Sequence, residues 1–355
     1  MDELADLRRQ IDEVDDSILA LLNRRADLAK GIAEVKRGLK SDLHIPVREK
    51  EIYERLLRQN TGPFPSDGVR SVFREIISAS LSLEGPLKVA YLGPRATFTH
   101  LACTQYFGFS VRDIPVNSIK EVFEEVERGR SDYGVVPVEN STEGVVSHTL
   151  DLFADSELKI FGEILQEVSH HLQSKSGKVE EVRKIYSHPH AIAQCKSWLE
   201  KNLPQAQVRE VSSTARAAEM AAEDPEAAAI ASELAARLYG LVIIQRRIED
   251  NINNFTRFLI IAQRSPARTG KDKTSIMFST KDRVGALFEM LRPFSDSRLN
   301  LTKIESRPSK KKAWEYLFYV DLLGHVEDEP VRRTLETLKE QALFMKILGS
   351  YPTAN

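Results

Sequence analysis

Cysteine is scarce in this chain of 355 residues, which contains only Cys103 and Cys195. Two cysteines this far apart in the sequence exclude a disulfide framework and any Cys-x-x-Cys zinc or redox motif. Long apolar runs are missing as well, since none approaches the roughly 18 residues that cross a bilayer. The opening decapeptide MDELADLRRQ has charges where a secretory signal has its apolar core. We therefore expect a reduced, cytoplasmic protein without a membrane partner.

An excess of either charge is also missing. The 50 Lys and Arg residues nearly balance the 52 Asp and Glu residues, and the formal net charge of −2 argues against a protein that binds nucleic acid through a broad positive field. The length is sufficient for two or three domains, and the hydrophobic fraction of 42% can supply their cores. No Gly-x-Gly-x-x-Gly or phosphate-loop pattern is present, and we expect neither a metal ion nor a cofactor.

Residues 1–85 contain almost no alternating β-pattern and are predicted to be helical. The expected helices are a first one of about 30 residues, hence about 45 Å long, and two shorter ones at residues 46–60 and 66–83. Three helices of such unequal length cannot cover one another, so the long helix is expected to pair with a second copy of the chain. Its apolar residues step by three and four, as in a heptad seam: Leu4, Leu7, Ile11, Val14, Ile18, Leu21, Leu28, Ile32 and Val35.

One position of this seam carries a cation. Between Leu21 and Leu28 the pattern requires an apolar residue, and the sequence has Arg25. A guanidinium that faces a helical interior is costly unless an anion meets it. The pattern alone leaves two interpretations open, a core salt bridge with Glu49 or Glu84 and a site for an anionic ligand.

Helix geometry relates two further cations to Arg25. Lys36 lies eleven residues later, about 20° around the helix and about 16 Å along it, so both side chains point the same way. Arg8 lies about 26 Å toward the other end of the helix, too far to join them within one chain. In an intertwined dimer, Arg8 could reach the site of the partner chain.

Four stretches of this block, LRRQID, RRADLA, PVREKEI and FREIISASLSLE, resemble the helical chorismate mutase family. In this family an intertwined dimer of three-helix chains rearranges chorismate, a dicarboxylate, to prephenate. The reaction is unimolecular, so it requires a compact bound conformer and donors for the developing charge but no nucleophile. The resemblance implies that arginines hold the carboxylates and that Lys36 bonds the breaking ether oxygen. The implied chorismate-binding residues are Arg8, Arg25, Lys36, Arg48, Glu49, Ser80 and Glu84.

Two positions depart from the family pattern. Ile45 stands where some members have a carboxylate, and Glu84 stands where a glutamine often shares the ether oxygen with the lysine. An ionised Glu84 would repel the negative charge that develops on this oxygen. We therefore hypothesise that Glu84 is catalytic in its protonated form, beside the second catalytic residue, Lys36. Mutase activity should then fall as the pH rises above neutral.

From residue 88 to residue 264 short β-rich runs alternate with amphipathic helices, which predicts an α/β domain. The alanine-rich run at residues 227–236 is predicted to be a surface helix. The expected strands are residues 88–92, 133–138, 184–186, 208–211, 241–246 and 255–262, and the expected helices are residues 97–107, 119–128, 189–201 and 214–222.

Polar motifs lie where several of these strands lead into a helix. They are GPRATF at residues 93–98, PVENST at 137–142, SHPH at 187–190 and SST at 212–214. Helix capping alone explains any one of them. Together they predict a crevice at the carboxyl ends of the strands, where helix N-termini favour an anion such as a small dicarboxylate.

The run NNFTRF at residues 253–258, with these motifs in the same order, resembles the prephenate dehydratase family over residues 88–264. The resemblance implies two α/β lobes around a cleft, similar to periplasmic binding proteins. It also implies a reaction that removes carbon dioxide and the ring hydroxyl of prephenate, with Thr256 as the proton donor and Arg257 as a carboxylate clamp beside it. The implied prephenate-binding residues are Thr97, Glu139, Asn140, Ser141, Thr142, Ser187, His190, Ser213, Thr214, Thr256 and Arg257.

Two residues of these motifs also depart from the family. Ala96 replaces a glycine of the first motif, and His190 replaces a glutamine of the third. An imidazole in place of an amide predicts that the dehydratase step responds to pH near neutrality. His188, two residues earlier, is interpreted as a packed cap residue.

Residues 273–355 follow a polar linker and are predicted to form a separate βαββαβ unit with the ferredoxin-like arrangement. The motifs GAL at 285–287 and ESRP at 305–308 resemble an ACT regulatory domain of the dehydratase type. Lys310 to Lys312 are interpreted as a solvated turn. The resemblance implies a phenylalanine-binding interface between subunits, formed by Gly285, Ala286, Leu287, Asn300, Leu301, Glu305 and Ser306.

In their order along the chain, the three blocks resemble a bifunctional chorismate mutase/prephenate dehydratase under feedback inhibition by phenylalanine. The implied partners are chorismate, prephenate, phenylalanine and further copies of the chain, in a homodimer or larger homo-oligomer. Two alternatives remain open. One is a dehydratase whose mutase domain is inactive because of Ile45 and Glu84. The other is a non-catalytic amino-acid sensor, which would have no need of Thr256, Arg25 or Lys36.

Overall fold

The computed structural model describes residues 2–39, 46–281, 283–309 and 316–354. By contacts between Cα atoms the chain forms two compact units, Met1–Lys88 with Phe107–Arg112, and Val89–Tyr106 with Asp113–Asn355. Ile45 and the lysine run at residues 310–312, on which expectations were placed above, lie outside the described residues. Within the described ranges, no helix is both long enough and apolar enough to cross a membrane.

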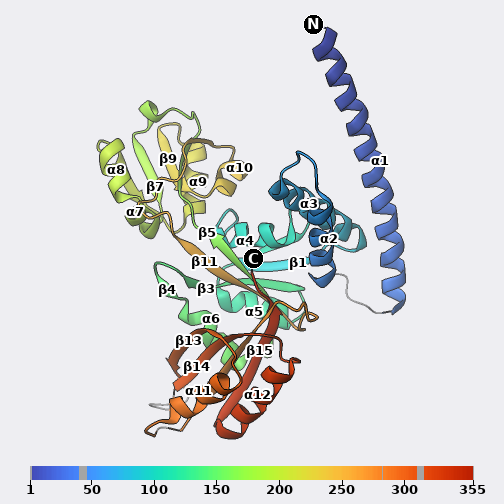
Figure 1. Cartoon of the computed structure of the whole chain (residues 1–355). Helices are drawn as coiled ribbons and strands as arrows, with labels where there is room; N and C mark the ends of the chain where they lie inside the picture. The colour runs from blue at the N-terminus through green and yellow to red at the C-terminus, as the bar shows by residue number, and fades with distance from the viewer. Residues whose placement is uncertain (1, 40–45, 282, 310–315, 355) are drawn as a thin grey trace. The chain divides into compact units, whose positions relative to one another are not determined.

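The first unit contains the three predicted helices (Figure 1). α1 spans Asp2–Leu39 and, at 38 residues, is longer than expected, while α2 spans Pro46–Gln59 and α3 spans Ser66–Glu84. α1 contacts α3, and Ala29 and Ala33 on α1 are buried. Small side chains at this contact allow the two helix backbones to approach closely.

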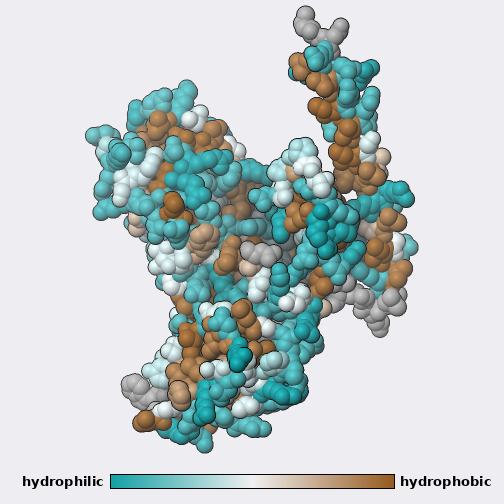
Figure 2. All heavy atoms as spheres, in the orientation of Figure 1, coloured by the Kyte–Doolittle hydropathy of each residue, from teal (hydrophilic) through white to brown (hydrophobic). Residues whose placement is uncertain are grey.

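The heptad seam of α1 is exposed within the single chain. Each of its nine apolar residues, Leu4 to Val35, has between 48% and 63% of its surface exposed. Figure 2 shows this apolar surface in brown along α1. Arg25 occupies the predicted position between Leu21 and Leu28, and its side chain hydrogen-bonds to α3.

The first lobe of the second unit is a mixed sheet with helices packed against it. In the sheet β1 and β3 are parallel, and β11 runs antiparallel to β3 and to β5. The strand order is β2(Arg112–Val116), β1(Lys88–Leu92), β3(Tyr133–Asn140), β11(Phe255–Ala262), β5(Lys159–Glu167), and the short strand β4(Gly144–Val145) pairs with β3. The helices of this lobe are α4(Phe98–Phe107), α5(Ile119–Glu127) and α6(Ser147–Asp155). β2, β4, β5 and α6 were not predicted.

The second lobe is a five-stranded sheet, also flanked by helices. Two segments connect the lobes, at residues 168–170 and 246–254, and the backbone N–H of Val168 donates to Asn254 O at 2.8 Å. The strand order is β10(Val242–Gln245), β6(His171–Ser174), β9(Ala227–Ala231), β7(Lys184–Ser187), β8(Gln207–Glu210). The helices of this lobe are α7(Pro189–Gln194), α8(Lys196–Asn202), α9(Thr214–Glu223) and α10(Glu233–Tyr239). The predicted two-lobed α/β architecture is confirmed.

The alanine-rich run is the clearest error of the sequence analysis. Residues 227–231 form the central strand β9 of the second lobe, fully buried, and a helix begins only at Glu233. Alanines of α9 pack against this strand, among them Ala217 and Ala221. Small side chains on both elements let the helix lie close to the sheet, and this packing outweighs the helix propensity of alanine.

The C-terminal part has the predicted βαββαβ order. Its elements are β12(Asp272–Ser279), α11(Ala286–Asp296), β13(Leu301–Pro308), β14(Tyr316–Leu323), α12(Glu329–Gln341) and β15(Phe344–Pro352), in an antiparallel sheet of order β13-β14-β12-β15. One face of the sheet packs on α11 and α12 through residues such as Phe278 and Val320. The other face, with Met277 and Tyr319, shares a core with Phe153 of the first lobe.

Three buried histidines predict that the fold is sensitive to acid. Burial is the largest cause of the lowered pKa values of His100, His170 and His171. Nδ1 of His100 accepts from the backbone N–H of Ala96, and Nδ1 of His171 accepts from that of Arg247, both at 3.0 Å. Protonation would remove these acceptors. Because the folded pKa values lie below the unfolded one, the unfolded chain takes up more protons as the pH falls below about 6.5.

We therefore expect the urea midpoint of unfolding to fall between pH 7.5 and pH 5.5. A His171→Gln variant should show a smaller pH slope, whereas His148→Gln, at an exposed histidine, should keep the wild-type slope. A wild-type midpoint that stays constant over this range would contradict the prediction.

Candidate active sites

Arg25 forms the centre of the candidate site in the helical unit. Its Nη1 donates to Ile76 O at 3.3 Å and to Ser80 Oγ, and both acceptors lie on α3. These partners are uncharged, and burial lowers the pKa of the guanidinium. Such a partly buried cation with neutral partners is suited to an anionic ligand. The alternative salt bridge with Glu84 is not formed.

Glu84 instead faces Lys36. Their Oε2 and Nζ atoms are 3.4 Å apart, and only 17% of the Lys36 side chain and 5% of the Glu84 side chain are exposed. The geometry thus brings Arg25, Lys36, Ser80 and Glu84 together on α1 and α3. That Glu84 acts in its protonated form when chorismate reacts stays a prediction.

Arg8 and Arg48 lie apart from this group within one chain. Arg8 is exposed and lies 28 residues before Lys36 on α1, which has 38 residues. Arg48 is exposed on α2 and pairs with Glu51 at 2.9 Å. Glu49 is half-buried on the same helix.

The main cavity of the candidate dehydratase site lies between the two lobes and has a volume of about 380 Å³, a size typical of small-molecule sites. Predicted residues that line it come from both lobes: Thr97, Asn140, His190, Ser213, Thr214 and Thr256. Their positions follow from local structure. Ser213 caps α9 by accepting from the backbone N–H of Arg216 at 3.0 Å, and Thr256 lies near the start of β11.

Asn140 fixes the direction in which Thr256 can donate its proton. Asn140 Oδ1 accepts from the backbone N–H groups of Thr142 and Glu143, both at 2.9 Å. This orientation leaves the Nδ2 group to donate to Thr256 Oγ1 and to Asn254 Oδ1, both at 2.8 Å. Because Thr256 Oγ1 already accepts from Asn140, its own hydroxyl proton is available to a ligand in the cavity.

This hydrogen-bond network extends to residues that the sequence analysis missed. Asn254 Nδ2 donates to Gln194 Oε1 at 3.1 Å, and His170 Nε2 lies 2.8 Å from the same oxygen. Burial lowers the pKa of His170, which is therefore neutral and donates through Nε2. Asn254 belongs to the NNFTRF motif, but neither Gln194 nor His170 belongs to a motif, and only the fold reveals them.

His190 reaches across the cleft. Its Nδ1 lies 2.9 Å from Glu143 Oε1 of the first lobe, and both side chains are largely exposed at the rim of the cavity. His188 caps α7 as interpreted, since its Nδ1 accepts from the backbone N–H of His190 at 3.3 Å, but it also lines the cavity. His188 and Ser212, which lie within the motifs, and Glu143, which directly follows PVENST, are thus further lining residues that were not predicted to bind prephenate.

The prediction that Arg257 clamps a carboxylate beside Thr256 is wrong for this structure. Successive side chains of a strand point to opposite faces, so Arg257 points away from the cavity that Thr256 lines. Its guanidinium donates to Glu163 at 2.7 Å and to Asp321 at 2.6 Å. Glu139, the neighbour of Asn140, is displaced in the same way and pairs with Lys303 at 2.6 Å.

Three other predicted residues also lie outside the cavity wall. Ser187 is the last residue of the buried strand β7. Its side chain is fully buried and donates to Ile230 O at 2.7 Å. Ser141 donates to Asn253 O at 3.1 Å and accepts from the backbone N–H of Phe255 at 2.9 Å, so it connects the two motif loops. Thr142 contributes its backbone N–H to Asn140.

Comparisons with known proteins match three parts of the chain to three families. Residues 7–85 match the family described as chorismate mutase type II, residues 89–266 match prephenate dehydratase, and residues 274–340 match the ACT domain. The bifunctional chorismate mutase/prephenate dehydratase of Aquifex aeolicus is 56% identical over 358 residues, which cover 100% of this chain and 99% of that protein. The chain belongs to the bifunctional chorismate mutase/prephenate dehydratase family.

Another member of this family and a solved structure extend the comparison. The bifunctional chorismate mutase/prephenate dehydratase of Pseudomonas aeruginosa is 42% identical and covers 99% of this chain, which covers 98% of it. The prephenate dehydratase of Arthrobacter aurescens in complex with L-Phe is 36% identical with a TM-score of 0.69, over 75% of this chain and 90% of that chain. The expectation of a bifunctional family member with an ACT domain is confirmed.

In this bifunctional family member, the residues predicted to bind phenylalanine lie on two segments of the ACT part. One segment is the start of its first helix, α11, and the other is the strand β13. Gly285 precedes α11 with a φ of 80°, a left-handed conformation that favours glycine, and Ala286 and Leu287 begin the helix. Leu301, Glu305 and Ser306 lie on β13, an edge strand of the sheet, and Asn300 directly precedes it.

Proposed function

We propose that the chain rearranges chorismate to prephenate in its helical unit and converts prephenate to phenylpyruvate in the cleft between the lobes. One observation carries the second activity. Asn140 Nδ2 donates a hydrogen bond to Thr256 Oγ1, which leaves the hydroxyl proton of Thr256 for a ligand in the cavity. Hydroxide is a poor leaving group. A donor beside the ring hydroxyl therefore lowers the barrier while the C–C bond to the departing carboxylate supplies the electron pair that makes the ring aromatic.

The Thr256 hydroxyl is a weak acid. Its effect therefore comes from a positioned hydrogen bond to the ring hydroxyl rather than from complete transfer of its proton. Thr97, Ser213 and Thr214 surround the same cavity and orient the substrate from both lobes. A substrate held between two lobes is also shielded from water, which strengthens each of these hydrogen bonds.

For the mutase reaction, Arg25 holds a carboxylate of chorismate and Lys36 donates to the ether oxygen. Ser80 and Glu84 complete the part of the site that one chain supplies. The exposed seam of α1 supports a homodimer, because nine large apolar side chains in one stripe would be buried by a second copy. In that dimer Arg8 of one chain enters the site of the other.

The chain limits, the effector and the location belong to the same proposal. We assign residues 1–85 to the mutase domain, 88–264 to the dehydratase domain and 273–355 to the ACT domain, in a cytoplasmic enzyme. Phenylalanine is the proposed feedback inhibitor and binds between ACT domains at Gly285 and β13. The complex of the Arthrobacter aurescens relative with L-Phe supports this effector.

One assay separates this proposal from its alternatives. The purified chain is given chorismate, and the loss of chorismate and the formation of phenylpyruvate are followed with and without phenylalanine. We expect both reactions, with phenylalanine reducing the second. Phenylpyruvate from supplied prephenate but no chorismate loss would indicate an inactive mutase domain, and the absence of both reactions would favour the sensor.

A further inference from the structure

The strand pair that carries Thr256 has a second functional face. In the β3–β11 ladder Thr256 lies opposite Asn140, and the next pair is Arg257 opposite Glu139. Side chains alternate along a strand, so the first pair lines the dehydratase cavity and the second pair faces the ACT sheet. The two pairs are neighbours on the same two backbones, and a displacement of one is transmitted to the other over a single residue.

The ACT sheet presents a matching pair of charges. Lys303 on β13 lies opposite Asp321 on β14 in their ladder. Lys303 Nζ donates to Glu139 Oε2 at 2.6 Å, and Asp321 Oδ2 accepts from Arg257 Nη1 at 2.6 Å. Two ion pairs of opposite polarity therefore join the Arg257–Glu139 pair of one sheet to the Lys303–Asp321 pair of the other.

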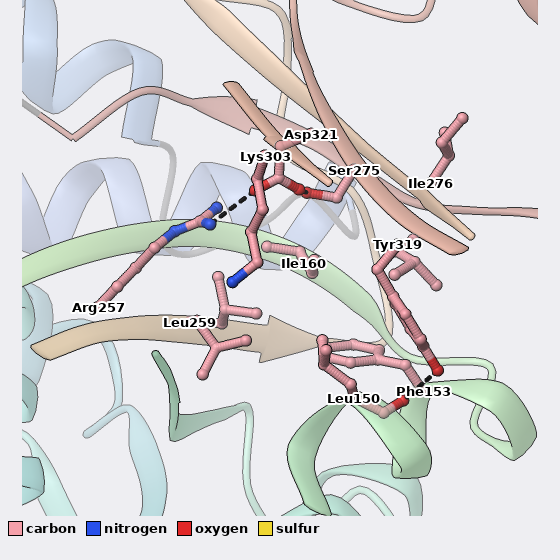
Figure 3. A pocket seen from close by; sticks show the side chains of 12 residues that line it. Leu150, Phe153, Ile160, Arg257, Leu259, Ser275, Ile276, Lys303, Tyr319 and Asp321 are labelled. Carbon is pink, nitrogen blue, oxygen red and sulfur yellow. Dashed lines mark hydrogen bonds and ion pairs between the residues drawn. The ribbon is translucent and has the colours of Figure 1, made fainter. Parts of the chain in front are cut away.

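Three of these four charged side chains are largely shielded from solvent. Only 11% of the Arg257 side chain, 10% of Asp321 and 13% of Lys303 are exposed, whereas 38% of the Glu139 side chain is exposed. Figure 3 shows the Arg257, Lys303 and Asp321 side chains pointing into the same space between the sheets. The cavity beside them has a volume of about 20 Å³, which is room for little more than a water molecule. The charges therefore neutralise one another and do not form a site for an organic ligand.

An irregularity in the strand pairing lies directly after the functional pairs. The β3–β11 register shifts between Arg257 and Phe258, where Val138 of β3 is the extra residue, whereas β11 pairs with β5 without a shift from Phe255 to Ile260. A bulge interrupts the ladder and bends its strand, so this ladder fixes the end of β3 that carries Glu139 and Asn140 less firmly than an unbroken one. On the face toward the ACT sheet, Lys303 holds Glu139 at 2.6 Å and Asp321 holds Arg257 at 2.6 Å.

We propose that Lys303 and Asp321, two residues of the ACT sheet, are positioning residues of the dehydratase site that act through Glu139 and Arg257. The inference rests on the proposed dehydratase function of Thr256. Lys303 fixes Glu139 and thereby the backbone of Asn140, and Asp321 fixes Arg257 and thereby that of Thr256. The ACT sheet is thus part of what aligns the Asn140–Thr256 hydrogen bond.

The test compares two lysines that both connect the ACT sheet to the first lobe. Lys303→Met removes the ion pair to Glu139 on β3. Lys346→Met is the matched control, because Lys346 donates to Ser156 O at 2.5 Å and pairs with Glu157 at 3.1 Å, beyond the end of α6 and away from β3 and β11. A displaced hydrogen bond weakens the transition state more than substrate binding. We expect Lys303→Met to lower the dehydratase kcat about ten-fold with little change in KM, and Lys346→Met to change neither.

Two further readouts exclude a general loss of structure. Lys303→Arg, which keeps the charge, should restore most of the kcat, and mutase activity should be the same in all variants. In a double-mutant cycle, Glu139→Gln added to Lys303→Met should lower the kcat no further, since both substitutions break one linkage. Additive effects, or equal effects of Lys303→Met and Lys346→Met, would overturn the inference.

Hydrogen exchange distinguishes a failure of this inference from a failure of the proposed function. Lys303→Met should increase deuterium uptake in peptides that cover residues 137–142 and 253–258 more than Lys346→Met does, whether or not the wild type forms phenylpyruvate. Equal uptake in the two variants would also overturn the inference. A wild type without dehydratase activity, but with this difference in uptake, would refute only the proposed function.

Discussion

Thr256→Ala should lower the kcat for phenylpyruvate formation by about 100- to 1000-fold, the loss expected when one preorganised hydrogen-bond donor is removed. The structure gives the reason, since Asn140 Nδ2 occupies the acceptor side of Thr256 Oγ1 at 2.8 Å and leaves the hydroxyl proton for the substrate. The measurement is steady-state formation of phenylpyruvate from supplied prephenate.

Two variants control for structural effects of this substitution. Thr256→Ser keeps the hydroxyl and should retain most of the activity. Thr149→Val removes another buried threonine hydroxyl of the same lobe, one that donates to Pro137 O at 2.6 Å, and should keep the wild-type kcat. Prephenate should still accumulate from chorismate in Thr256→Ala. Loss of both reactions in a folded variant would contradict separate sites.

Lys36→Met should lower the mutase kcat by a similar factor, about 100- to 1000-fold. The ammonium group is the donor for the ether oxygen, and no other lysine of α1 shares its position against Glu84 among the described residues. Lys30→Met is the matched control, because Lys30 lies on the same helix, exposed, and pairs only weakly with Asp27 at 3.6 Å. Dehydratase activity on supplied prephenate should be unchanged in both variants. A mutase kcat within two-fold of the wild type in Lys36→Met would contradict the assigned role.

Glu84→Gln examines the same pair from the other side. If Glu84 acts in its protonated form, the wild-type mutase loses activity as the pH rises above neutral, and the glutamine variant keeps its activity there. Identical pH profiles for the two enzymes would show that the titration of Glu84 is not the cause. The Lys36→Met variant keeps Glu84 but lacks the ammonium donor. It therefore distinguishes the effect of Glu84 titration from a change in substrate binding.

Local patterns predicted a large part of the fold. The three helices of the first unit, strands such as Lys88–Leu92 and Phe255–Ala262, and the βαββαβ order of the ACT part all follow from hydrophobic periodicity. The errors have a common physical cause. The run at residues 227–231 has the composition of a helix, but it is a buried strand because α9 packs against it. β5 and β6 were missed because their buried polar residues, such as Glu163 and Gln173, hide the strand pattern.

By itself the sequence determined which chemical groups are present and in which order: cations on one face of α1, hydroxyls and amides after the strands, and the three blocks typical of a bifunctional enzyme. Only the tertiary structure decided which of these groups meet. It placed Arg257 and Glu139 against the ACT sheet rather than in the cavity, and it added His170 and Gln194 to the network around Thr256. The reason is geometric. Neighbours in a strand point to opposite faces, and residues far apart in the sequence become neighbours only when sheets and lobes pack.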